Sequence, residues 1–438
     1  MKKLKTIWWA VKLFVARVRY RNPSKKLKIV GVTGTNGKTT AVTLLHKITT
    51  ALGYKSGLIG TVEILIGEEK FKLDSNKPMP ATTPDSIFLT KLFARMVEAG
   101  CEYVFMEVSS HALDQNRVAG IKFTGGIFTN LTHDHLDYHK DLESYFRAKK
   151  KFFEMLPKNA FALSNIDDEY GDAILDSIKA EKFFYGFEDL FPKDGLLGTQ
   201  KTVFGEYFRG KILKSDFSGL KLDFNGEIVN SKLLGKFNAY NLLAIWGACK
   251  LLGFDMLKVK KIMGKIEPPR GRFEHFVSKN GIIVIVDYAH SPDALEKVLL
   301  TIREIIPTRV GTPTGVGEST RGRIISVFGC GGDRDTSKRP KMGKIGASLS
   351  DIAIFTSDNP RSENPDKIIE AMKDNLSHEE SKKVITILNR RLAIEEAVEL
   401  AREGDIILCA GKGHEEYQEI KGVKSHFNDM EEFKKITR

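Results

Sequence analysis

An apolar strand, a glycine-rich loop and a helix follow one another directly near the start of the chain. The strand covers 27–32, the loop contains Gly34-Thr-Asn-Gly-Lys-Thr39, and the helix runs over 39–52 and ends at Gly53. Such a loop directs backbone N–H groups and a helix N-terminus at phosphate oxygens, while its lysine offsets their charge and its hydroxyl completes a Mg²⁺ shell. The motif therefore predicts an α/β fold that binds ATP.

The loop departs from the strict phosphate-loop pattern at one position. The pattern G-x-x-x-x-G-K-[ST] requires a glycine where this chain has Val32, so the match rests on the shorter form G-T-x-G-K-T. The alternative is a glycine-rich turn with an incidental lysine. We expect the triphosphate to be bound by the residues of this loop, which are Gly34, Thr35, Asn36, Gly37, Lys38, Thr39 and Thr40.

Length and composition indicate a folded protein of more than one domain. The 438 residues exceed one ordinary core, and 42% of them are apolar. The four cysteines lie far apart without metal-ligand spacing, so neither disulfides nor a zinc ribbon is expected. We therefore expect a cytoplasmic location. The net charge of +12 comes from scattered lysines without a nucleic-acid-binding motif, which favours a polyanionic small molecule over nucleic acid as partner.

Residues 1–26 form a separate basic segment. The stretch 7–19 mixes bulky apolar residues with cations, and it is too short and too charged to span a bilayer. It also lacks the cleavage site of a secretory signal. Two interpretations remain for residues 1–24: a helix that packs on the protein or a partner, and a basic helix on an anionic membrane surface.

Alternating strands and helices predict two α/β domains, joined at Pro268-Pro-Arg-Gly271. In the central phosphate-loop domain, 27–268, the further expected elements are strands 102–108 and 126–131, short strands within 160–230, and helices 141–156 and 238–252. In the C-terminal Rossmann-like domain, 269–438, they are strands 282–287, 324–328, 352–357 and 405–410, and helices 292–304, 338–349, 365–375 and 390–402. Residues 308–322 are rich in Gly, Thr and Pro, and this composition predicts a mobile surface loop. Both sheets are expected to be mostly parallel.

Two features point to metal or phosphate chemistry. Glu107 ends the buried strand 103–108, where ligands bind in open α/β sheets and a carboxylate can hold Mg²⁺; otherwise it caps a helix or pairs with a surface lysine. The run Asn130-Leu-Thr-His-Asp-His-Leu-Asp-Tyr-His139 concentrates histidines and aspartates as a metal or phosphate site does. A zinc hydrolase of the metallo-β-lactamase type is a second interpretation, although Tyr138 interrupts its H-x-H-x-D-H spacing.

Lys149 lies in an unusual position for a lysine. The predicted helix 141–156 has one apolar face, formed at helical spacing by Leu142, Phe146, Lys149, Phe153 and Leu156. Desolvation would favour the neutral amine, which can react with CO₂ to give an anionic carbamate. The alternative is a lysine that snorkels out of this face into solvent.

A series of ordered motifs resembles the Mur ligases, in particular their tripeptide-synthetase branch, over residues 27 to 430. The motifs are Gly34-Thr-Asn-Gly-Lys-Thr39, Glu107-Val-Ser-Ser-His111, Asp134-His-Leu-Asp-Tyr-His139, Ala148-Lys149, Phe237-Asn-Ala-Tyr-Asn241, Gly271-Arg-Phe-Glu274, Asp287-Tyr-Ala-His-Ser-Pro-Asp293, Gly329-Cys-Gly-Gly-Asp-Arg-Asp335, Asp358-Asn-Pro-Arg361 and Gly411-Lys-Gly-His-Glu415.

The resemblance implies a monomeric, ATP-dependent amide ligase of peptidoglycan precursor synthesis. It would add a diamino acid, meso-diaminopimelate, to UDP-N-acetylmuramoyl-L-alanyl-D-glutamate through an acyl phosphate, with two Mg²⁺ ions and a CO₂-derived carbamate on Lys149. It implies the metal ligands Thr39, Glu107, His135 and Lys149, with Lys38, Glu107, His135 and Lys149 as catalytic residues. It further implies nucleotide contacts from Asn241, Arg272 and Asp287, and acceptor contacts from Thr82, Thr83, Ser109 and His111. The implied amino-acid contacts are Arg334, Asp358, Asn359, Arg361, Gly411 and Glu415.

The choice of amino acid agrees with elementary electrostatics. A guanidinium can bind the distal carboxylate of meso-diaminopimelate through two parallel hydrogen bonds, whereas lysine would bring its own cation against Arg361. The alternative for Arg361 is a structural surface ion pair.

The chain also departs from the family at its start. Family members carry a domain ahead of the phosphate loop that binds the uridine nucleotide, whereas about 26 residues precede the strand here. We therefore expect the acceptor to be held mainly by Thr82, Thr83 and the centre around Lys149. Alternative functions are a folylpolyglutamate or poly-γ-glutamate ligase, and a non-catalytic nucleotide-binding relic.

Overall fold

The chain folds into two compact units. The computed structural model describes Val15, 17–71, 81–132, Asp134, 136–187, 207–306 and 322–437, with the backbone alone for 136 and 137. Unit 1 reaches to Glu267, and unit 2 runs from Pro268 onwards and includes the short segments Ser215–Ser218 and Leu233–Gly235. Of the expected mobile loop 308–322, only Gly322 lies within the described residues. In the part of the chain that the structure describes, no helix combines the length and apolarity needed to cross a bilayer.

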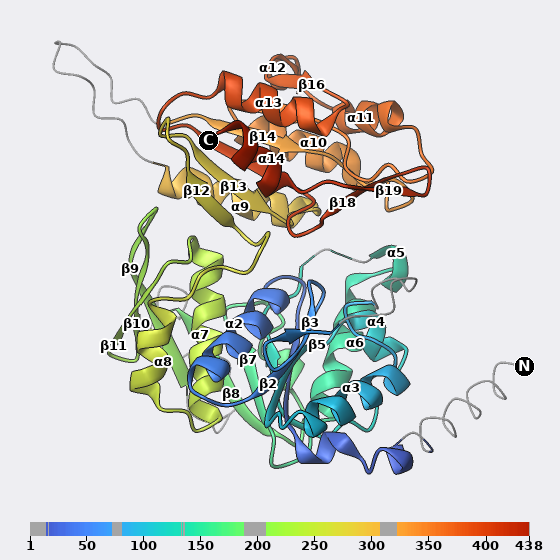
Figure 1. Cartoon of the computed structure of the whole chain (residues 1–438), viewed down its shortest axis with the longest axis vertical. Coiled ribbons are helices and arrows are strands. Elements are labelled where there is room, and N and C mark those ends of the chain that lie inside the picture. The colour runs from blue at the N-terminus through green and yellow to red at the C-terminus, as the bar shows by residue number, and fades with distance from the viewer. Residues whose placement is uncertain are drawn as a thin grey trace, which may run out of the picture. The chain divides into compact units, whose positions relative to one another are not determined.

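Unit 1 is built on an eleven-stranded, mostly parallel sheet in the order β11-β10-β9-β8-β7-β6-β1-β5-β2-β3-β4 (Figure 1). Its strands are β1 (Lys28–Thr33), β2 (Ser56–Ile59), β3 (Ile64–Ile66), β4 (Glu69–Lys70), β5 (Tyr103–Glu107), β6 (Phe123–Phe128), β7 (Phe161–Asn165), β8 (Glu181–Phe187), β9 (Tyr207–Asp216), β10 (Gly219–Phe224) and β11 (Glu227–Ser231). The central strand β1 pairs in parallel with β5 on one side and β6 on the other. The loops that follow these three strands therefore meet at one edge of the sheet, where ligands bind in such folds.

The helices of unit 1 are α2 (Lys38–Ala51), α3 (Ser86–Glu98), α4 (Ser110–Asp114), α5 (Leu136–His139), α6 (Leu142–Glu154), α7 (Lys236–Leu251) and α8 (Met256–Met263). Four of them, α3, α4, α6 and α8, begin after a residue whose side chain caps them. Asp85 accepts hydrogen bonds from two backbone N–H groups at the start of α3, and Asp141 accepts one from Ser144 at the start of α6. Each cap satisfies a donor that the helix itself leaves open. Sequence analysis did not predict α3, α4, α5 or α8.

The buried face of α6 differs from the predicted one. Lys149, Phe153 and Leu156 are buried as expected, whereas Leu142 and Phe146 are only partly buried. Phe152 is fully buried instead, because Gly31 of β1 and Gly126 of β6 have no side chain: a Cβ at either position would lie within 3 Å of the Phe152 ring. The ring thus packs directly on the sheet, and this rotates the helix relative to the face read from spacing alone.

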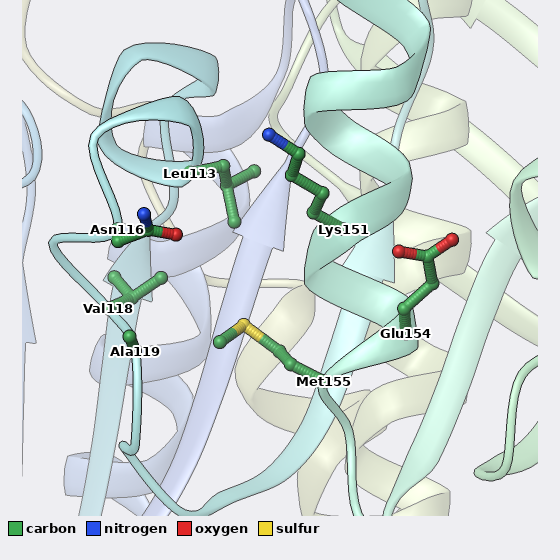
Figure 2. Close-up of a pocket in the computed structure, with 7 residues that line it drawn as sticks. All are labelled: Leu113, Asn116, Val118, Ala119, Lys151, Glu154 and Met155. Carbon is green, nitrogen blue, oxygen red and sulfur yellow. The ribbon is translucent and has the colours of Figure 1, made fainter.

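A cavity of about 300 Å³ lies between the end of α4 and helix α6 (Figure 2). Its walls are Leu113, Asn116, Val118 and Ala119 on one side and Lys151, Glu154 and Met155 on the other. Across this space Lys151 forms an exposed ion pair of 3.7 Å with Asp114. None of the predicted site residues lines this cavity.

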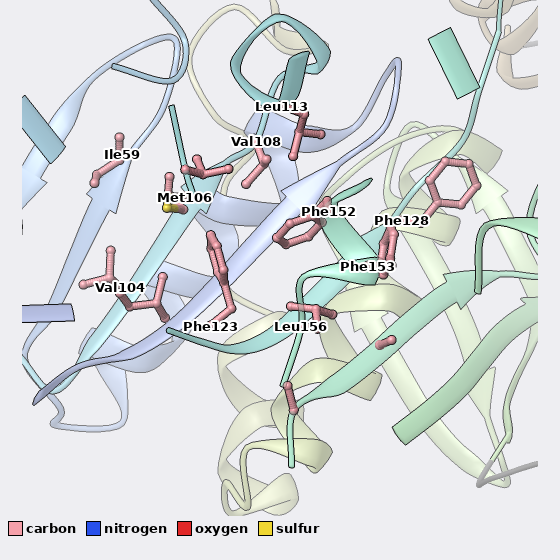
Figure 3. Close-up of a cluster of buried hydrophobic side chains, with 14 of the residues drawn as sticks. Ile59, Val104, Met106, Val108, Leu113, Phe123, Phe128, Phe152, Phe153 and Leu156 are labelled. Atoms are coloured by element: carbon pink, nitrogen blue, oxygen red, sulfur yellow. The ribbon is translucent and has the colours of Figure 1, made fainter. Parts of the chain in front are cut away.

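The main core of unit 1 lies beneath α3 and α6. Apolar side chains of the alternating positions Val104, Met106 and Val108 face Phe123, Phe152 and Phe153 (Figure 3). The Phe123 and Phe152 rings meet edge to face, with centroids 5.0 Å apart. This core holds α6, and therefore Lys149, firmly against the central strands.

Unit 2 has its own six-stranded sheet in the order β12-β13-β17-β14-β15-β16. Its strands are β12 (Glu274–Val277), β13 (Ile283–Asp287), β14 (Ile324–Phe328), β15 (Ile352–Phe355), β16 (Val384–Thr386) and β17 (Ile406–Ala410). Its helices are α9 (Pro292–Ile305), α10 (Lys338–Leu349), α11 (Pro365–Lys373), α12 (His378–Lys382), α13 (Arg390–Leu400) and α14 (Asp429–Ile436). All neighbouring pairs are parallel except the edge pair β12–β13. The predicted fold class, two mostly parallel α/β sheets in sequence, is confirmed.

A small hairpin stands outside this sheet. Strands β18 (Tyr417–Ile420) and β19 (Val423–His426) pair with each other across the turn Lys421–Gly422. Both turn residues have positive φ, 50° and 79°, as a tight two-residue hairpin turn requires. Sequence analysis did not predict the hairpin, which lies directly after the Gly411–Glu415 motif.

Candidate active site

The phosphate loop needs glycine at two positions for steric reasons. Gly34 has φ 149° and Gly37, which caps α2, has φ 86°. A Cβ on Gly34 would lie 1.9 Å from Thr129 Oγ1, and a Cβ on Gly37 would lie 2.4 Å from Asn241 Oδ1. The loop therefore closes against two neighbouring side chains only because both residues are glycine.

The loop that follows β6 holds the phosphate loop in place. The Thr35 amide donates to the Asn130 carbonyl at 2.8 Å, and the Asn36 amide donates to Asn130 Oδ1 at 2.9 Å. Thr129 Oγ1 donates to the Asn36 carbonyl at 2.6 Å. Sequence analysis missed these positioning roles of Thr129 and Asn130, although their place at the end of β6 could have signalled them.

Two predicted catalytic lysines meet at one carbonyl oxygen. Lys38 Nζ donates to the Gly34 carbonyl at 2.8 Å and to the Thr35 carbonyl at 2.7 Å. Lys149 Nζ donates to the same Gly34 carbonyl at 2.9 Å, although it comes from α6. The two Nζ atoms therefore lie close together at the base of the phosphate loop.

Lys149 is buried rather than exposed. Only 1% of its surface is exposed, and its Nζ lies 4.3 Å from the centroid of the Tyr145 ring, so the snorkelling interpretation is wrong. Burial lowers the pKa of Lys149 well below its ordinary value, and the charge of Lys38 lowers it further. Asp134 and Asp168 act in the opposite direction. The neutral amine is favoured, as the position of the residue in the apolar face predicted.

Glu107 connects the phosphate loop with the predicted acceptor loop. Thr39 Oγ1 donates to Glu107 Oε1 at 3.0 Å. The amide of Thr61 donates to Oε1 at 2.8 Å, its hydroxyl donates to Oε2 at 3.1 Å, and the same hydroxyl lies 3.1 Å from Thr82 Oγ1. The alternative role of Glu107, pairing with a surface lysine, is wrong, because it is 1% exposed and its partners are threonines. Sequence analysis missed Thr61.

The other predicted acceptor residues lie beside this group. Thr83 Oγ1 donates to the Glu107 carbonyl at 2.9 Å and accepts a hydrogen bond from the Ser109 amide at 3.0 Å. Arg117, which sequence analysis did not single out, donates to the Thr83 carbonyl at 2.8 Å. The His111 ring packs on Tyr138, with centroids 4.1 Å apart. The structure thus gathers the acceptor candidates at the ends of β5 and β6.

The predicted metal ligand His135 lies outside the described residues. Within the described ranges, no cluster of three or more His, Cys, Asp or Glu side chains has the arrangement of a metal site. A zinc site of the hydrolase type is therefore not present in the described part of the chain. The paired oxygens of Thr39 and Glu107 instead suit Mg²⁺, which needs few protein ligands because it keeps waters and substrate phosphates.

In unit 2 the predicted nucleotide contacts lie at the end of β13. The Phe273 amide donates to Asp287 Oδ2 at 2.7 Å, and the Arg272 guanidinium lies 4.6 Å from the Tyr288 ring centroid. Burial raises the pKa of Asp287 to about 6, although Arg272 and the backbone donors Phe273 and Ala289 partly oppose this rise. Asn241, the third nucleotide candidate, belongs to unit 1 and contacts Asn238 at 3.1 Å.

The predicted amino-acid contacts gather at the carboxyl ends of three adjacent strands, β17, β14 and β15. Gly411 has φ 110°, and a Cβ there would lie 2.6 Å from Asp358 Oδ2. Asn359 Nδ2 donates to Glu415 Oε2 at 2.8 Å. Burial raises the pKa of Glu415, the charge of Asp358 raises it further, and Lys412 opposes both. These four candidates therefore form one contiguous group.

Arg361 and Arg334 lie on either side of the glycine loop after β14. Arg361 Nη1 donates to the Gly332 carbonyl at 2.7 Å, and its Nε lies 3.9 Å from Glu419 Oε2. A Cβ on Gly331 would lie 3.0 Å from Arg361 Nη1 and 3.8 Å from Arg334 Cγ. The glycines thus leave space between the two guanidinium-bearing side chains. Arg361 does form the ion pair that sequence analysis gave as its alternative role, at a distance typical of a weak pair.

Models of known protein families match both halves of the chain. Residues 32–249 match the description "Mur ligase middle domain", and residues 271–413 match "Mur ligase, glutamate ligase domain". Curated relatives with high identity are UDP-N-acetylmuramoyl-L-alanyl-D-glutamate–2,6-diaminopimelate ligases. That of Parabacteroides distasonis is 48% identical over 98% of this chain and 81% of its own length. That of Clostridium botulinum is 43% identical over 96% and 80%.

Solved structures of ligases also resemble this chain. A 2,6-diaminopimelate ligase of this kind is 30% identical, with a TM-score of 0.62 over 96% of this chain and 81% of its own. A Mycobacterium tuberculosis folylpolyglutamate synthase, complexed with ADP and AMPPCP, has a TM-score of 0.68 over 92% of each chain. Because its identity is only 16%, that likeness concerns the fold alone.

Proposed function

This chain belongs to the Mur ligase family, and from that premise we propose that it joins meso-diaminopimelate to UDP-N-acetylmuramoyl-L-alanyl-D-glutamate with ATP. The observation that carries the proposal is the convergence of Lys38, Lys149 and the Thr39–Glu107 pair at the end of the central strands. A relative that is 48% identical over 98% of this chain carries that activity in its name. The substrate is thus proposed from the relatives, and the chemistry from the site.

The phosphate loop provides for ATP and Mg²⁺, on which Mur ligases depend. Thr39 Oγ1 and Glu107 Oε1, 3.0 Å apart, offer the hard oxygen donors that Mg²⁺ prefers. We assign His135 and a modified Lys149 as further ligands. Bound Mg²⁺ would offset negative charge on the phosphates during transfer. Backbone N–H groups of the loop and the N-terminus of α2 would hold the triphosphate, and Asn241, Arg272 and Asp287 would contact the nucleoside.

The reaction proceeds in two displacement steps. A carboxylate oxygen of the acceptor attacks the γ-phosphorus, the bond to ADP breaks, and an acyl phosphate forms. The neutral amine of the diamino acid then attacks the acyl carbon, the bond to phosphate breaks, and the amine loses a proton as the amide forms. Lys38, released from the Gly34 and Thr35 carbonyls, would stabilise the charge that develops on the transferred phosphoryl group.

We assign a carbamate to Lys149 on electrostatic grounds. As an ammonium, Lys149 lies beside the Lys38 ammonium at a shared acceptor, which is unfavourable. A neutral Lys149 Nζ can attack CO₂, and loss of a proton leaves an anionic carbamate. Repulsion between the two side chains would then become attraction, and the new oxygens would be available to a metal ion.

Unit 2 supplies recognition of the incoming amino acid. Glu415 would accept a hydrogen bond from one ammonium group, while Arg361 would bind the distal carboxylate that lysine lacks. Arg334, Asp358, Asn359 and Gly411 complete this site in the proposal. Thr82, Thr83, Ser109 and His111 would contact the acceptor.

The same proposal extends to the setting of the enzyme. We propose a cytoplasmic location, which agrees with four free, buried cysteines. We further propose that the protein is a monomer. Contact of residues 1–24 with an anionic membrane surface belongs to this proposal too, and sedimentation with anionic vesicles at low and high salt tests it.

The test of function is phosphate release by the full chain with a panel of substrates. We expect release only when ATP, the muramoyl dipeptide and a diamino acid are all present, with a tripeptide product of matching mass. The kcat/KM for meso-diaminopimelate should exceed that for lysine. Equal phosphate release without an acceptor would reduce the protein to an ATPase, and a preference for lysine would contradict the assignment of Arg361.

A further inference from the structure

A fully buried lysine lies at the centre of the proposed amino-acid site. Lys412 is 0% exposed and follows β17. Its Nζ donates to Glu415 Oε2 at 3.1 Å, to Asn359 Oδ1 at 3.3 Å and to the Tyr417 carbonyl at 2.5 Å. An ammonium group has three donors, and here each of them has an acceptor.

These contacts determine which oxygen of Glu415 a ligand can reach. Oε2 accepts from Lys412 and also from Asn359 Nδ2 at 2.8 Å. The orientation of the Asn359 amide is determined in turn, because its Oδ1 accepts from Lys412 and from the Glu419 amide at 2.9 Å. Within the described residues no hydrogen bond reaches Glu415 Oε1. That oxygen is therefore available for a substrate ammonium.

The same lysine holds the strand that shapes the opposite end of the site. Tyr417, whose carbonyl Lys412 binds, begins β18. Further along this strand, the Arg361 amide donates to the Glu419 carbonyl at 3.2 Å, and the Lys421 amide donates to the Arg361 carbonyl at 2.7 Å. These bonds support Arg361 in its left-handed conformation, with φ 51°. Glu415 and Arg361 are thus attached to one hairpin.

We propose that Lys412 is a positioning residue that orients the Glu415 carboxylate and, through strand β18, sets its spacing from the Arg361 guanidinium, so that the site selects a long diamino dicarboxylic acid. This inference rests on the proposed function of the cluster as the amino-acid site. Lys412 itself does not contact the substrate. Its role is to keep the two recognition groups in register and to leave Glu415 Oε1 for the ligand.

The charges around Glu415 make this role measurable. Burial and the charge of Asp358 raise the pKa of Glu415, whereas the charge and the hydrogen bond of Lys412 lower it. The other titratable groups that interact with it are Tyr288 after β13 and Tyr417 on β18. Without Lys412, Glu415 would lose its main opposing cation and would take up a proton at higher pH.

The decisive variant is Lys412→Met, which keeps the length of the side chain and removes the charge. Its KM for meso-diaminopimelate at neutral pH should rise at least about tenfold. The reason is the loss of the charge-assisted hydrogen bond by which Lys412 orients the Glu415 carboxylate. Its KM for ATP should stay within about twofold. The defect in the amino-acid KM should shrink as the pH rises, because Glu415 ionises again. A purely structural defect would not recover in this way.

Lys424→Met is the matched control. Lys424 lies on β19, with its Nζ 4.3 Å from the centroid of the same Tyr417 ring, but it is exposed. Its replacement removes a cation near the hairpin without touching Glu415 or Asn359. We expect the KM values and the pH profile of the wild type.

A second measurement tests the inference without catalysis. The carboxyl ¹³C shift of Glu415, followed by NMR against pH in the full-length protein, should have a higher midpoint in Lys412→Met than in the wild type and in Lys424→Met. An unchanged midpoint, or an amino-acid KM that stays at the wild-type value across the pH range, overturns the inference. Failure of the wild type to use any diamino acid would instead contradict the proposed function, and the titration would still decide the role of Lys412.

Discussion

At the scale of single residues, Lys149 shows how burial can change the chemistry of a side chain. Its Nζ donates a hydrogen bond to the Gly34 carbonyl at 2.9 Å, and only 1% of the residue's surface is exposed. Burial and the neighbouring Lys38 both lower its pKa. An amine whose neutral form is favoured by burial can become a carbamate, whereas an exposed lysine remains an ammonium.

Lys149→Ala should reduce turnover about a hundredfold or more, because the proposed anionic ligand is lost. Acetate or formate should restore part of the activity by filling the space and supplying carboxylate oxygens. Phosphate release, with and without these anions, is the measurement. The neighbour Lys150→Ala, at a position that is only partly buried, serves as control. Full activity of Lys149→Ala would remove the residue from the mechanism.

Asp287 illustrates the cost of a buried carboxylate. Burial raises its pKa to about 6, against an ordinary 3.8, so the folded state binds more protons than the unfolded state between these values. Stability from this group is therefore present below about pH 4 and is lost as the pH rises through about 6. Asp287→Asn should be more stable than the wild type above pH 6, by about 1 to 3 kcal/mol.

Amide hydrogen exchange in β13 and β17 reads the local free energy of unfolding at pH 5 and pH 8. The control is Asp405→Asn, for which the sign is opposite. Burial would raise the pKa of Asp405, but hydrogen bonds from Arg323 and Arg402 and the charge of Arg323 outweigh burial and lower it. That variant should be destabilised at neutral pH. A wild type that is more stable than Asp287→Asn at pH 8 would contradict the argument.

At the scale of elements, the connection from β1 to α2 depends on a glycine with no room for a side chain. Gly34→Ala places a Cβ 1.9 Å from Thr129 Oγ1 and 3.1 Å from the Asn130 backbone. The loop must shift, and we expect Mg²⁺-ATP affinity to fall more than tenfold, measured by calorimetry. Gly53→Ala, at the other end of α2, is the control: φ is 94° but nothing lies within 4 Å of the new Cβ.

Gly53→Ala should therefore cost about 1 to 2 kcal/mol through backbone strain alone and leave ATP affinity unchanged. Equal loss of affinity in both variants would mean that strain in α2, and not the shape of the phosphate loop, controls nucleotide binding.

At the scale of the whole molecule, nucleotide and amino-acid candidates belong largely to different units with separate sheets. Each ligand alone should therefore protect its own unit. At a hundredfold excess over Kd, binding stabilises by about 2.7 kcal/mol, which slows exchange from the bound state about a hundredfold. Mg²⁺ with a non-hydrolysable ATP analogue should slow amides in 34–40, and meso-diaminopimelate should slow those in 358–361 and 417–420. Protection of 34–40 but not of 358–361 by the amino acid would contradict the assignment of sites.

The sequence by itself determined the fold class, the phosphate loop and the apolar setting of Lys149. These are local properties, because they depend on the order of apolar and polar residues and on glycines and capping residues at fixed spacing. The predicted strands and helices agree with the structure to within a few residues in most cases. The list of candidate site residues followed from the resemblance of the motifs to those of the Mur ligases.

Only the tertiary structure decided how those residues meet. Lys38 and Lys149 are far apart in the sequence, yet both donate to the Gly34 carbonyl, because β1 and α6 pack in one core. The links through Thr61 to Glu107 and through Lys412 to Glu415 carried no readable signal, since hydrogen bonds between loops depend on strand order and register. A strand's place in a sheet is set by long-range pairing and packing, and local periodicity does not encode it.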